Sequence, residues 1–151
     1  MNLTEVIQAW TTIDAKLNKV IKINSEQFDE LVSKAFGSIP PPYKDRVANI
    51  AILVEDEPDE AQRQKLRLKN GETLFGLYEG VPLPARGGAS KMLPDKITLF
   101  KTPLMSASAD LSQLQERINH TVWHEVAHYF GLDHERIHEL EKPKIMKREK
   151  E

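Results

Sequence analysis

Residues 120–141 read HTVWHEVAHYFGLDHERIHELE, and this stretch decides the fold of the chain. Within it, His124, Glu125, His128, Gly131 and His134 spell H-E-x-x-H-x-x-G-x-x-H. On a helix that advances about 100° per residue, His124 and His128 lie about 40° apart and one turn apart in height. Both imidazoles can therefore reach the same metal ion.

The other three residues of this motif predict a catalytic rather than a structural metal site. Glu125 points about 100° away from His124, which suits a carboxylate that contacts metal-bound water and acts as a general base. Gly131 can adopt the left-handed conformation that ends a helix, so that the chain turns back and His134 approaches the ion. Three neutral imidazoles leave a fourth position for water. The sequence therefore predicts Zn²⁺ bound by His124, His128 and His134, with Glu125 as the catalytic residue.

The metal helix also has a separate apolar face, which predicts that it packs into a core. This face is centred about 150° from the two histidines of the helix. It carries Val122, Trp123, Val126, Ala127 and Phe130. Asp110 and Gln113 form a suitable cap, so we expect the helix to run from about Leu111 to Phe130. A further helical turn or two is expected over residues 135–140.

The composition is that of one ordinary globular domain, which we assign to residues 1–151. Charged residues make up 29% of the chain, hydrophobic residues 40%, and the formal net charge is -2. This charge gives no electrostatic reason to expect a nucleic-acid partner. The chain has no cysteine, which excludes disulfides and thiolate metal ligands. No segment resembles a targeting peptide or a membrane span, so we expect a cytoplasmic protein without membrane contact.

Two helices are predicted before the first strand. The first spans about residues 2–22 and has a narrow apolar stripe at alternating three- and four-residue spacing. The stripe consists of Leu3, Val6, Trp10, Ile13, Leu17 and Val20. The second helix begins at a cap formed by Asn24 and Gln27 and stops at Gly37 and the prolines at 40–42. We expect the two helices to pack together in a monomer. A coiled-coil dimer and an inhibitory position over the metal cleft are the alternatives.

Four short segments have strand character. They are residues 47–54, 66–68, 73–79 and 97–100. The dense aliphatic run at 47–54 predicts a central strand, and the dipeptide Asn70-Gly71 predicts a hairpin between the next two segments. The acidic residues 55–60 and the residues 80–94, rich in glycine and proline, predict loops, the second one bordering the active site. Either 73–79 or 96–101 is expected to offer a free edge to an extended substrate.

Taken together, these segments resemble the small prokaryotic zincin-like metallopeptidases. The resemblance runs from Phe28 to about Leu140. It is carried by FDELV at 28–32, ILVEDEP at 52–58, LFGLYEGVPL at 74–83, DKITLFK at 95–101 and the metal helix. It implies an α+β minimal zincin-like fold, with N-terminal helices and a small twisted mixed sheet packed on the active-site helix. It also implies a zinc peptidase in which His124 and His128 bind the metal and Glu125 is the base. That family often has aspartate where this chain has His134, which instead resembles the metzincin arrangement.

Two other functions are compatible with the motif. The pattern H-x-x-x-H-x-x-G-x-D-H, which this chain matches through Asp133, resembles the metal motif of a bacterial endoribonuclease family that matures ribosomal RNA. That family usually has glycine directly after the first histidine and a basic segment upstream. This chain has Glu125 and no such segment, so we favour a peptide or protein substrate. The other function is that of a non-catalytic metal-binding domain that recognises a peptide.

Several other polar residues lie close to the motif in sequence or are able to stabilise a reaction intermediate. His120, His138, Tyr78 and Tyr129 are of this kind, and we expect packing or surface roles for them. Glu135, Glu139 and Glu141 are the alternative ligands if His134 turns away from the metal.

Overall fold

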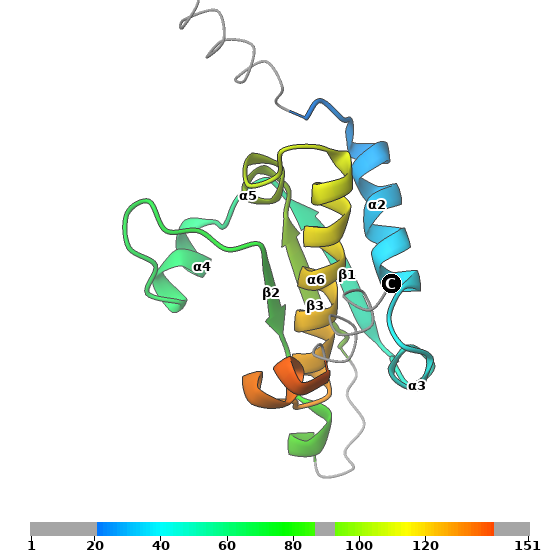
Figure 1. Cartoon of the computed structure of the whole chain (residues 1–151). Helices are drawn as coiled ribbons and strands as arrows, with labels where there is room; N and C mark the ends of the chain where they lie inside the picture. The colour runs from blue at the N-terminus through cyan, green and yellow to red at the C-terminus, as the bar shows by residue number, and fades with distance from the viewer. Residues whose placement is uncertain (1–20, 87–92, 141–151) are drawn as a thin grey trace, which may run out of the picture.

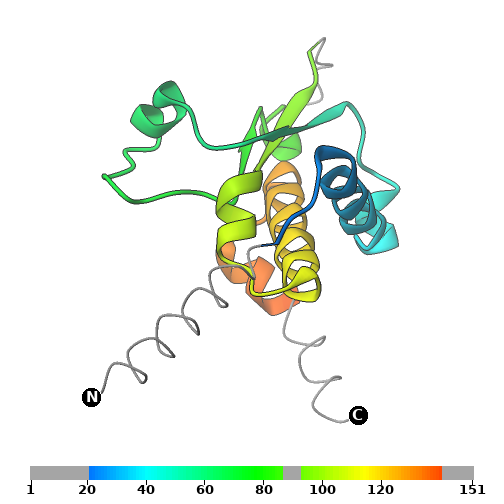
Figure 2. The same cartoon turned by 90° about the horizontal axis from the view of Figure 1, so that it is seen from above.

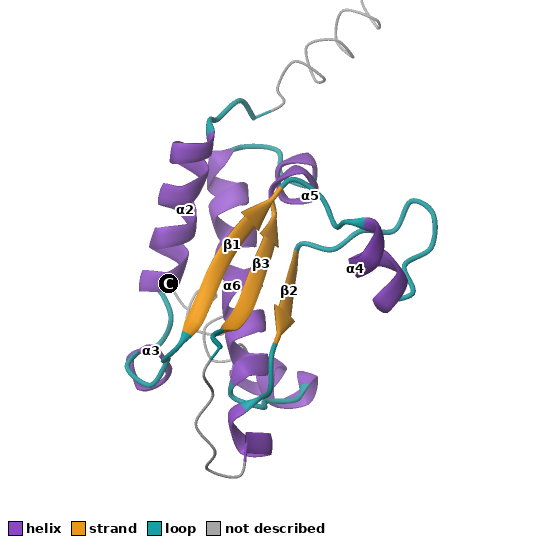
Figure 3. Ribbon diagram, turned by 180° about the vertical axis from the view of Figure 1, so that it is seen from behind, coloured by secondary structure: helices purple, strands orange, loops and turns teal. Residues whose placement is uncertain are grey.

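The computed structural model describes residues 21–86 and 93–140. Within them, a three-stranded sheet has helices α2 (Ser25–Gly37) and α6 (Leu111–Tyr129) on one face. Figures 1 and 2 show these two helices side by side, and Figure 3 shows the sheet in front of them when seen from behind. The fold is α+β, as predicted. The predicted helix at 2–22 lies outside the described residues except for residues 21 and 22, which are not helical, so its packing stays a prediction, as does the single-domain assignment.

The sheet is mixed, and its strand order is β1-β3-β2. Strand β1 (Ile50–Glu55) runs parallel to β3 (Asp95–Phe100), and β2 (Gly76–Glu79) runs antiparallel to β3. The prediction of a central strand at 47–54 is therefore wrong, because β1 lies at an edge and β3 occupies the centre. Leu53 and Val54 are 41% and 36% exposed. A run of aliphatic residues indicates a strand but does not determine its place in the sheet.

The predicted hairpin around Asn70-Gly71 is also wrong. Residues 66–68, where the first hairpin strand is expected, form no strand, and a short helix, α4 (Glu60–Lys65), ends directly before them. Asp59 and Gln62 form two reciprocal hydrogen bonds at its N-terminus. The Gln62 backbone N–H donates to Asp59 Oδ1 at 2.7 Å, and the Asp59 backbone N–H donates to Gln62 Oε1 at 2.8 Å. This capping box starts a helix inside the acidic segment. Strand β2 consequently pairs only with β3.

The predicted caps of the two long helices are confirmed. Asn24 and Gln27 form a capping box at the start of α2, and the Asp110 side chain accepts from the Gln113 backbone N–H at the start of α6. Two further short helices, besides α4, were not predicted. One is α3 (Pro41–Lys44), whose prolines occupy the first-turn positions where no backbone N–H is needed. The other is α5 (Lys101–Ser106), which follows β3 directly. Residues 83–86 in the predicted loop form a 3-10 helix.

The core lies between the sheet and the pair formed by α2 and α6. Its fully buried members come from α2, β3 and α6, namely Phe28, Ala35, Ile97, Leu99, Leu114, Ile118, Val122 and Val126. The predicted apolar face of the metal helix is therefore confirmed. Because this face is fixed by packing, the opposite face of α6 is held in one orientation. In the part of the chain that the structure describes, no helix is long and apolar enough to cross a membrane.

Gly131, directly after α6, is a glycine whose replacement should disturb the fold. Its φ is +76°, and a Cβ added there would lie 2.8 Å from Pro84 Cγ. A non-glycine residue in the left-handed region costs about 1 to 3 kcal/mol. We expect Gly131→Ala to lower the free energy of unfolding by at least that amount, as measured by urea denaturation. Gly37→Ala is the matched control, because no atom lies within 4 Å of its added Cβ. An equal loss in both variants would contradict the prediction.

Candidate metal centre

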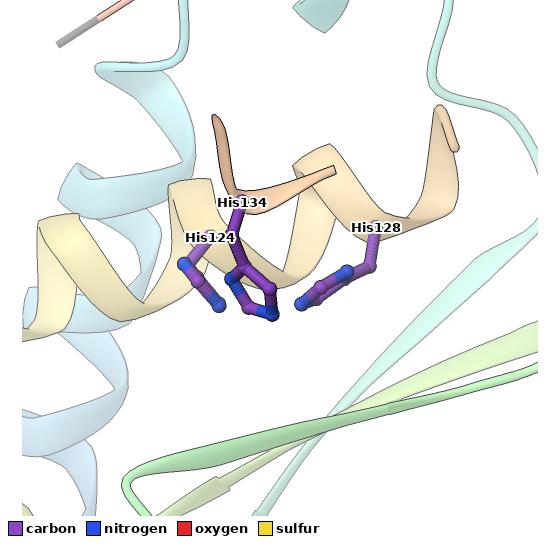
Figure 4. Close-up of side chains that lie close together, drawn as sticks. All are labelled: His124, His128 and His134. Atoms are coloured by element: carbon purple, nitrogen blue, oxygen red, sulfur yellow. The ribbon is translucent and has the colours of Figure 1, made fainter. Parts of the chain in front are cut away.

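The structure brings the three predicted metal ligands together. His124 and His128 come from successive turns of α6, and His134 comes from the chain that follows it. In Figure 4 the three imidazoles point toward one another. Their ring centroids are 4.8 Å apart for His124 and His128, 5.1 Å for His124 and His134, and 5.3 Å for His128 and His134. The prediction that these side chains face a common point agrees with this geometry.

His134 reaches this position because of the turn that ends α6. The Gly131 N–H donates to the His128 carbonyl at 2.9 Å, and the Leu132 N–H donates to the Ala127 carbonyl at 3.0 Å. These two bonds and the positive φ of Gly131 form the Schellman motif that closes many helices. Asp133 then accepts from the Arg136 N–H at 2.8 Å, and residues 134–140 form a second helix. Sequence reasoning missed this cap, although an aspartate before a helical segment is its ordinary signal.

The three histidines fit a metal ion of the size of zinc. One nitrogen from each side chain lies within 4.8 Å of the other two. A tetrahedral zinc with bonds of about 2.0 to 2.1 Å holds its ligand nitrogens about 3.4 Å apart. Small side-chain rotations therefore suffice to close the site around an ion. His124 and His128 are partly buried and His134 is exposed, so the site is open on one side.

The surroundings of the two α6 histidines keep them in the form that binds metal. Burial is the largest cause that lowers the pKa of His124, followed by the positive charges that the neighbouring histidines would carry, and the result is a pKa of about 4. Burial and His134 lower the pKa of His128 as well. Only a neutral imidazole has a nitrogen lone pair free for a metal. The site is therefore arranged for a cation before any cation binds.

Glu125 lies on the metal helix where α6 contacts β2. Its side chain is buried, with 8% of the residue exposed. Burial raises the pKa of Glu125 to about 7, and a hydrogen bond from the Tyr78 backbone N–H opposes this rise. A general base works best when its pKa is near the pH of the reaction. A carboxyl group with this pKa can both accept and donate a proton near neutral pH.

The remaining candidate residues do not join the three ligands. The His120 ring stacks beside His124 at 6.3 Å, one helical turn earlier, and is not among the converging ligand atoms of the described residues. The Tyr129 hydroxyl donates to the Ala48 carbonyl at 3.0 Å, and the Tyr78 hydroxyl donates to Asp95 Oδ2 at 2.5 Å. Both tyrosine hydroxyls therefore serve packing, as expected. The charge of His138 is the smallest of the causes that lower the pKa of His124.

The raised pKa of Glu125 predicts how the stability of the metal-free protein depends on pH. The folded state holds this proton more tightly than the unfolded state, whose pKa is about 4.5. The bound proton therefore stabilises the folded state fully below about pH 4.5, and this stabilisation is lost as the pH rises through about 7. Glu125→Gln removes this titration. We therefore expect the free energy of unfolding of the variant to rise relative to that of the wild type by on the order of 3 kcal/mol between about pH 4.5 and pH 8.

Urea unfolding of both metal-free proteins at several pH values measures this difference. The histidines titrate in both proteins, so their contribution cancels in the comparison. A difference in free energy that does not change with pH would contradict the assigned environment of Glu125.

Comparison with known proteins gives two findings. A family model described as zincin-like metallopeptidase matches residues 47–143, which include the sheet, α6 and all three histidines. The chain is also similar to the endoribonuclease YbeY of Bartonella quintana (strain Toulouse). The two are 28% identical over 108 residues, which cover 67% of this chain and 68% of that protein. The family implies a hydrolase that depends on a metal ion, and the histidine cluster offers a place for that ion. Since the family match extends over more than half of its residues, this chain belongs to the zincin-like metallopeptidases.

Proposed function

We propose that this protein is a zinc-dependent peptidase in which Glu125 is the general base. The observation that carries the proposal is the buried Glu125, with a pKa of about 7, directly after the first histidine of the metal cluster. A carboxylate at this position of the helix is suited to proton transfer rather than to metal binding. The family match supports the same class of chemistry.

The protein's own residues have two separate tasks in this reaction. His124, His128 and His134 would hold the ion and orient it toward the open side of the site. A zinc ion bound in this way polarises a carbonyl group and lowers the pKa of water. Glu125 accepts a proton from the water that attacks the peptide carbonyl carbon. It then donates that proton to the leaving amine nitrogen, so that one carboxylate acts as base and then as acid.

Strand β2 is the proposed contact for an extended peptide. Of the two strands predicted to offer a free edge, β3 lies at the centre of the sheet and has no such edge. Strand β2 is an edge strand, and it lies against α6. Backbone groups on an edge strand can pair with an added strand, which binds a peptide largely independently of its side chains.

An endoribonuclease is the second candidate function, and the similarity to YbeY is the observation that favours it. His124, His128, Gly131, Asp133 and His134 also fit the nuclease pattern H-x-x-x-H-x-x-G-x-D-H. Against it stand Glu125 at the position after the first histidine and a formal net charge of -2. An acidic protein gains little from the phosphate contacts that dominate nucleic-acid binding. We therefore rank this activity second.

Parallel digests of a peptide library and of structured RNA by the zinc-loaded protein distinguish these functions. We expect metal-dependent peptide cleavage, detected by mass spectrometry, and intact RNA. His128→Ala is the control for both digests, because it removes one ligand of the metal. RNA cleavage that disappears in this variant, without peptide cleavage, would reverse the ranking. Bound zinc without cleavage of either substrate would instead indicate the non-catalytic recognition domain.

A further inference from the structure

Strand β2 approaches α6 more closely than a residue with a Cβ atom allows, and the contact is at Gly76. A Cβ added to Gly76 would lie 2.7 Å from Thr121 Cγ2 on α6 and 3.3 Å from Leu99 Cδ2 on β3. Thr121 is buried, and its Oγ1 donates to the Arg117 carbonyl at 2.7 Å. This bond and the restricted χ1 of a β-branched residue hold the methyl group in place. A larger residue at 76 would therefore push β2 away from α6.

The next residue on the same face of β2 is Tyr78, and one turn beyond Thr121 on α6 is Glu125. The Phe100 N–H donates to the Phe75 carbonyl at 2.9 Å. In an antiparallel pair, the backbone groups of every second residue bond to the neighbouring strand. The backbone groups of Leu77 therefore bond to β3, whereas the N–H of Tyr78 points to the free edge of β2. There it donates to the Glu125 carboxylate. The close contact between Gly76 and Thr121 and the hydrogen bond from Tyr78 to Glu125 thus lie next to each other along β2 and α6.

The side chain of Tyr78 connects β2 to both β3 and α6. Its hydroxyl donates to Asp95 Oδ2 at 2.5 Å, and Asp95 is buried at the start of β3. Its ring meets the Tyr129 ring of α6 edge to face at a centroid distance of 6.4 Å. These two contacts tie Tyr78 to β3 and to α6. The small residue at 76 permits the close approach of β2 to the helix.

We infer that Gly76 is a positioning residue, which lets β2 approach α6 so closely that the Tyr78 N–H holds the Glu125 carboxylate in place. The carboxylate is held by the main chain of the same strand that we propose as the peptide contact. The base and the substrate would then be aligned by one element. The effect on turnover rests on the proposed function, whereas the effect on the hydrogen bond does not.

Gly76→Ala tests this inference through the exchange of a single amide hydrogen. In the metal-free protein, we expect the Tyr78 amide to exchange at least about tenfold faster in this variant, because it loses a bond to a charged acceptor. The Leu77 amide, which bonds to β3, should keep its protection. Bound zinc should remain at the wild-type level, since none of the three histidines lies on β2. In the zinc-loaded protein, kcat for peptide hydrolysis should fall at least tenfold.

The double variant Gly76→Ala/Thr121→Ser separates positioning from a general loss of stability. Serine lacks the Cγ2 methyl that the new Cβ would meet, but it keeps the hydroxyl that bonds to Arg117. We expect protection of the Tyr78 amide and kcat to recover toward those of Thr121→Ser alone. Gly37→Ala serves as the matched glycine replacement at a site with no neighbouring atom within 4 Å.

The exchange rates of the Tyr78 and Leu77 amides and the cleavage of peptides distinguish the possible outcomes. Wild-type exchange of the Tyr78 amide in Gly76→Ala would overturn the inference. If exchange rises equally at Leu77 and Tyr78, the double variant decides, and failure to recover protection at Tyr78 overturns the inference. If the amides respond as expected but no variant cleaves peptides, the positioning of Glu125 stands and the proposed peptidase function fails.

Discussion

Glu125→Gln is expected to lower kcat for peptide hydrolysis by about 10²- to 10⁴-fold, which is the usual contribution of a positioned acid–base group. Glutamine has nearly the same shape as glutamate but cannot accept the proton of the attacking water. The three histidines are unchanged in this variant. Zinc content should therefore stay at one ion per chain, while turnover is lost. Activity assays and metal analysis of the same preparation measure both quantities.

The matched control for this variant is Glu116→Gln, because Glu116 is an exposed glutamate earlier on the same helix. It should retain wild-type turnover. Undiminished hydrolysis by Glu125→Gln would remove Glu125 from the mechanism. Loss of zinc together with activity would show that Glu125 supports the metal site rather than the proton transfer.

His128→Ala is expected to weaken zinc binding more than about 100-fold. Loss of a group that only orients a ligand costs about 10- to 100-fold in metal affinity, and loss of a ligand should cost more. Hydrolysis should fall with zinc occupancy. His120→Ala is the matched control, since His120 lies on the same helix, stacks beside His124 and is outside the converging cluster. Competition with a chelator of known affinity measures both variants, and equal affinities would contradict the ligand assignment.

The metal helix and its ligands could be predicted from the sequence because their determinants are local. The spacing of His124 and His128, the cap at Asp110 and the turn at Gly131 each depend on a few consecutive residues. A helix fixes the relative directions of its side chains once it forms. The placement of His134 follows from the same local turn, so three converging imidazoles could be expected without knowledge of the sheet.

The order of the strands could not be predicted in the same way, because it depends on contacts between distant segments. Strand β1 has the more continuous aliphatic sequence, yet β3 is the central strand. In the segment after β1, the bonds between Asp59 and Gln62 start a helix, and residues 66–68 add no strand to the sheet. The capping signal at Asp59 and Gln62 is local in the sequence, whereas the partner of a strand is not.

The contact between β2 and Glu125 was also beyond sequence reasoning, although it left a trace. A glycine inside a strand often marks a close approach of another backbone or side chain, and Gly76 is such a glycine. The side chain that Gly76 approaches is that of Thr121, which lies 45 positions further along the chain. Only the packing of the sheet on α6 reveals that the base is held by an edge strand.

We propose that a single zinc ion at the three histidines, with Glu125 beside it, hydrolyses peptide bonds. Zinc titration of the chelator-treated wild-type protein, with peptide hydrolysis measured after each addition, tests this claim. We predict no hydrolysis without zinc, a linear rise with added zinc, and a plateau at one ion per chain. Full hydrolysis by the metal-free protein, or none with one zinc bound per chain, would contradict the claim.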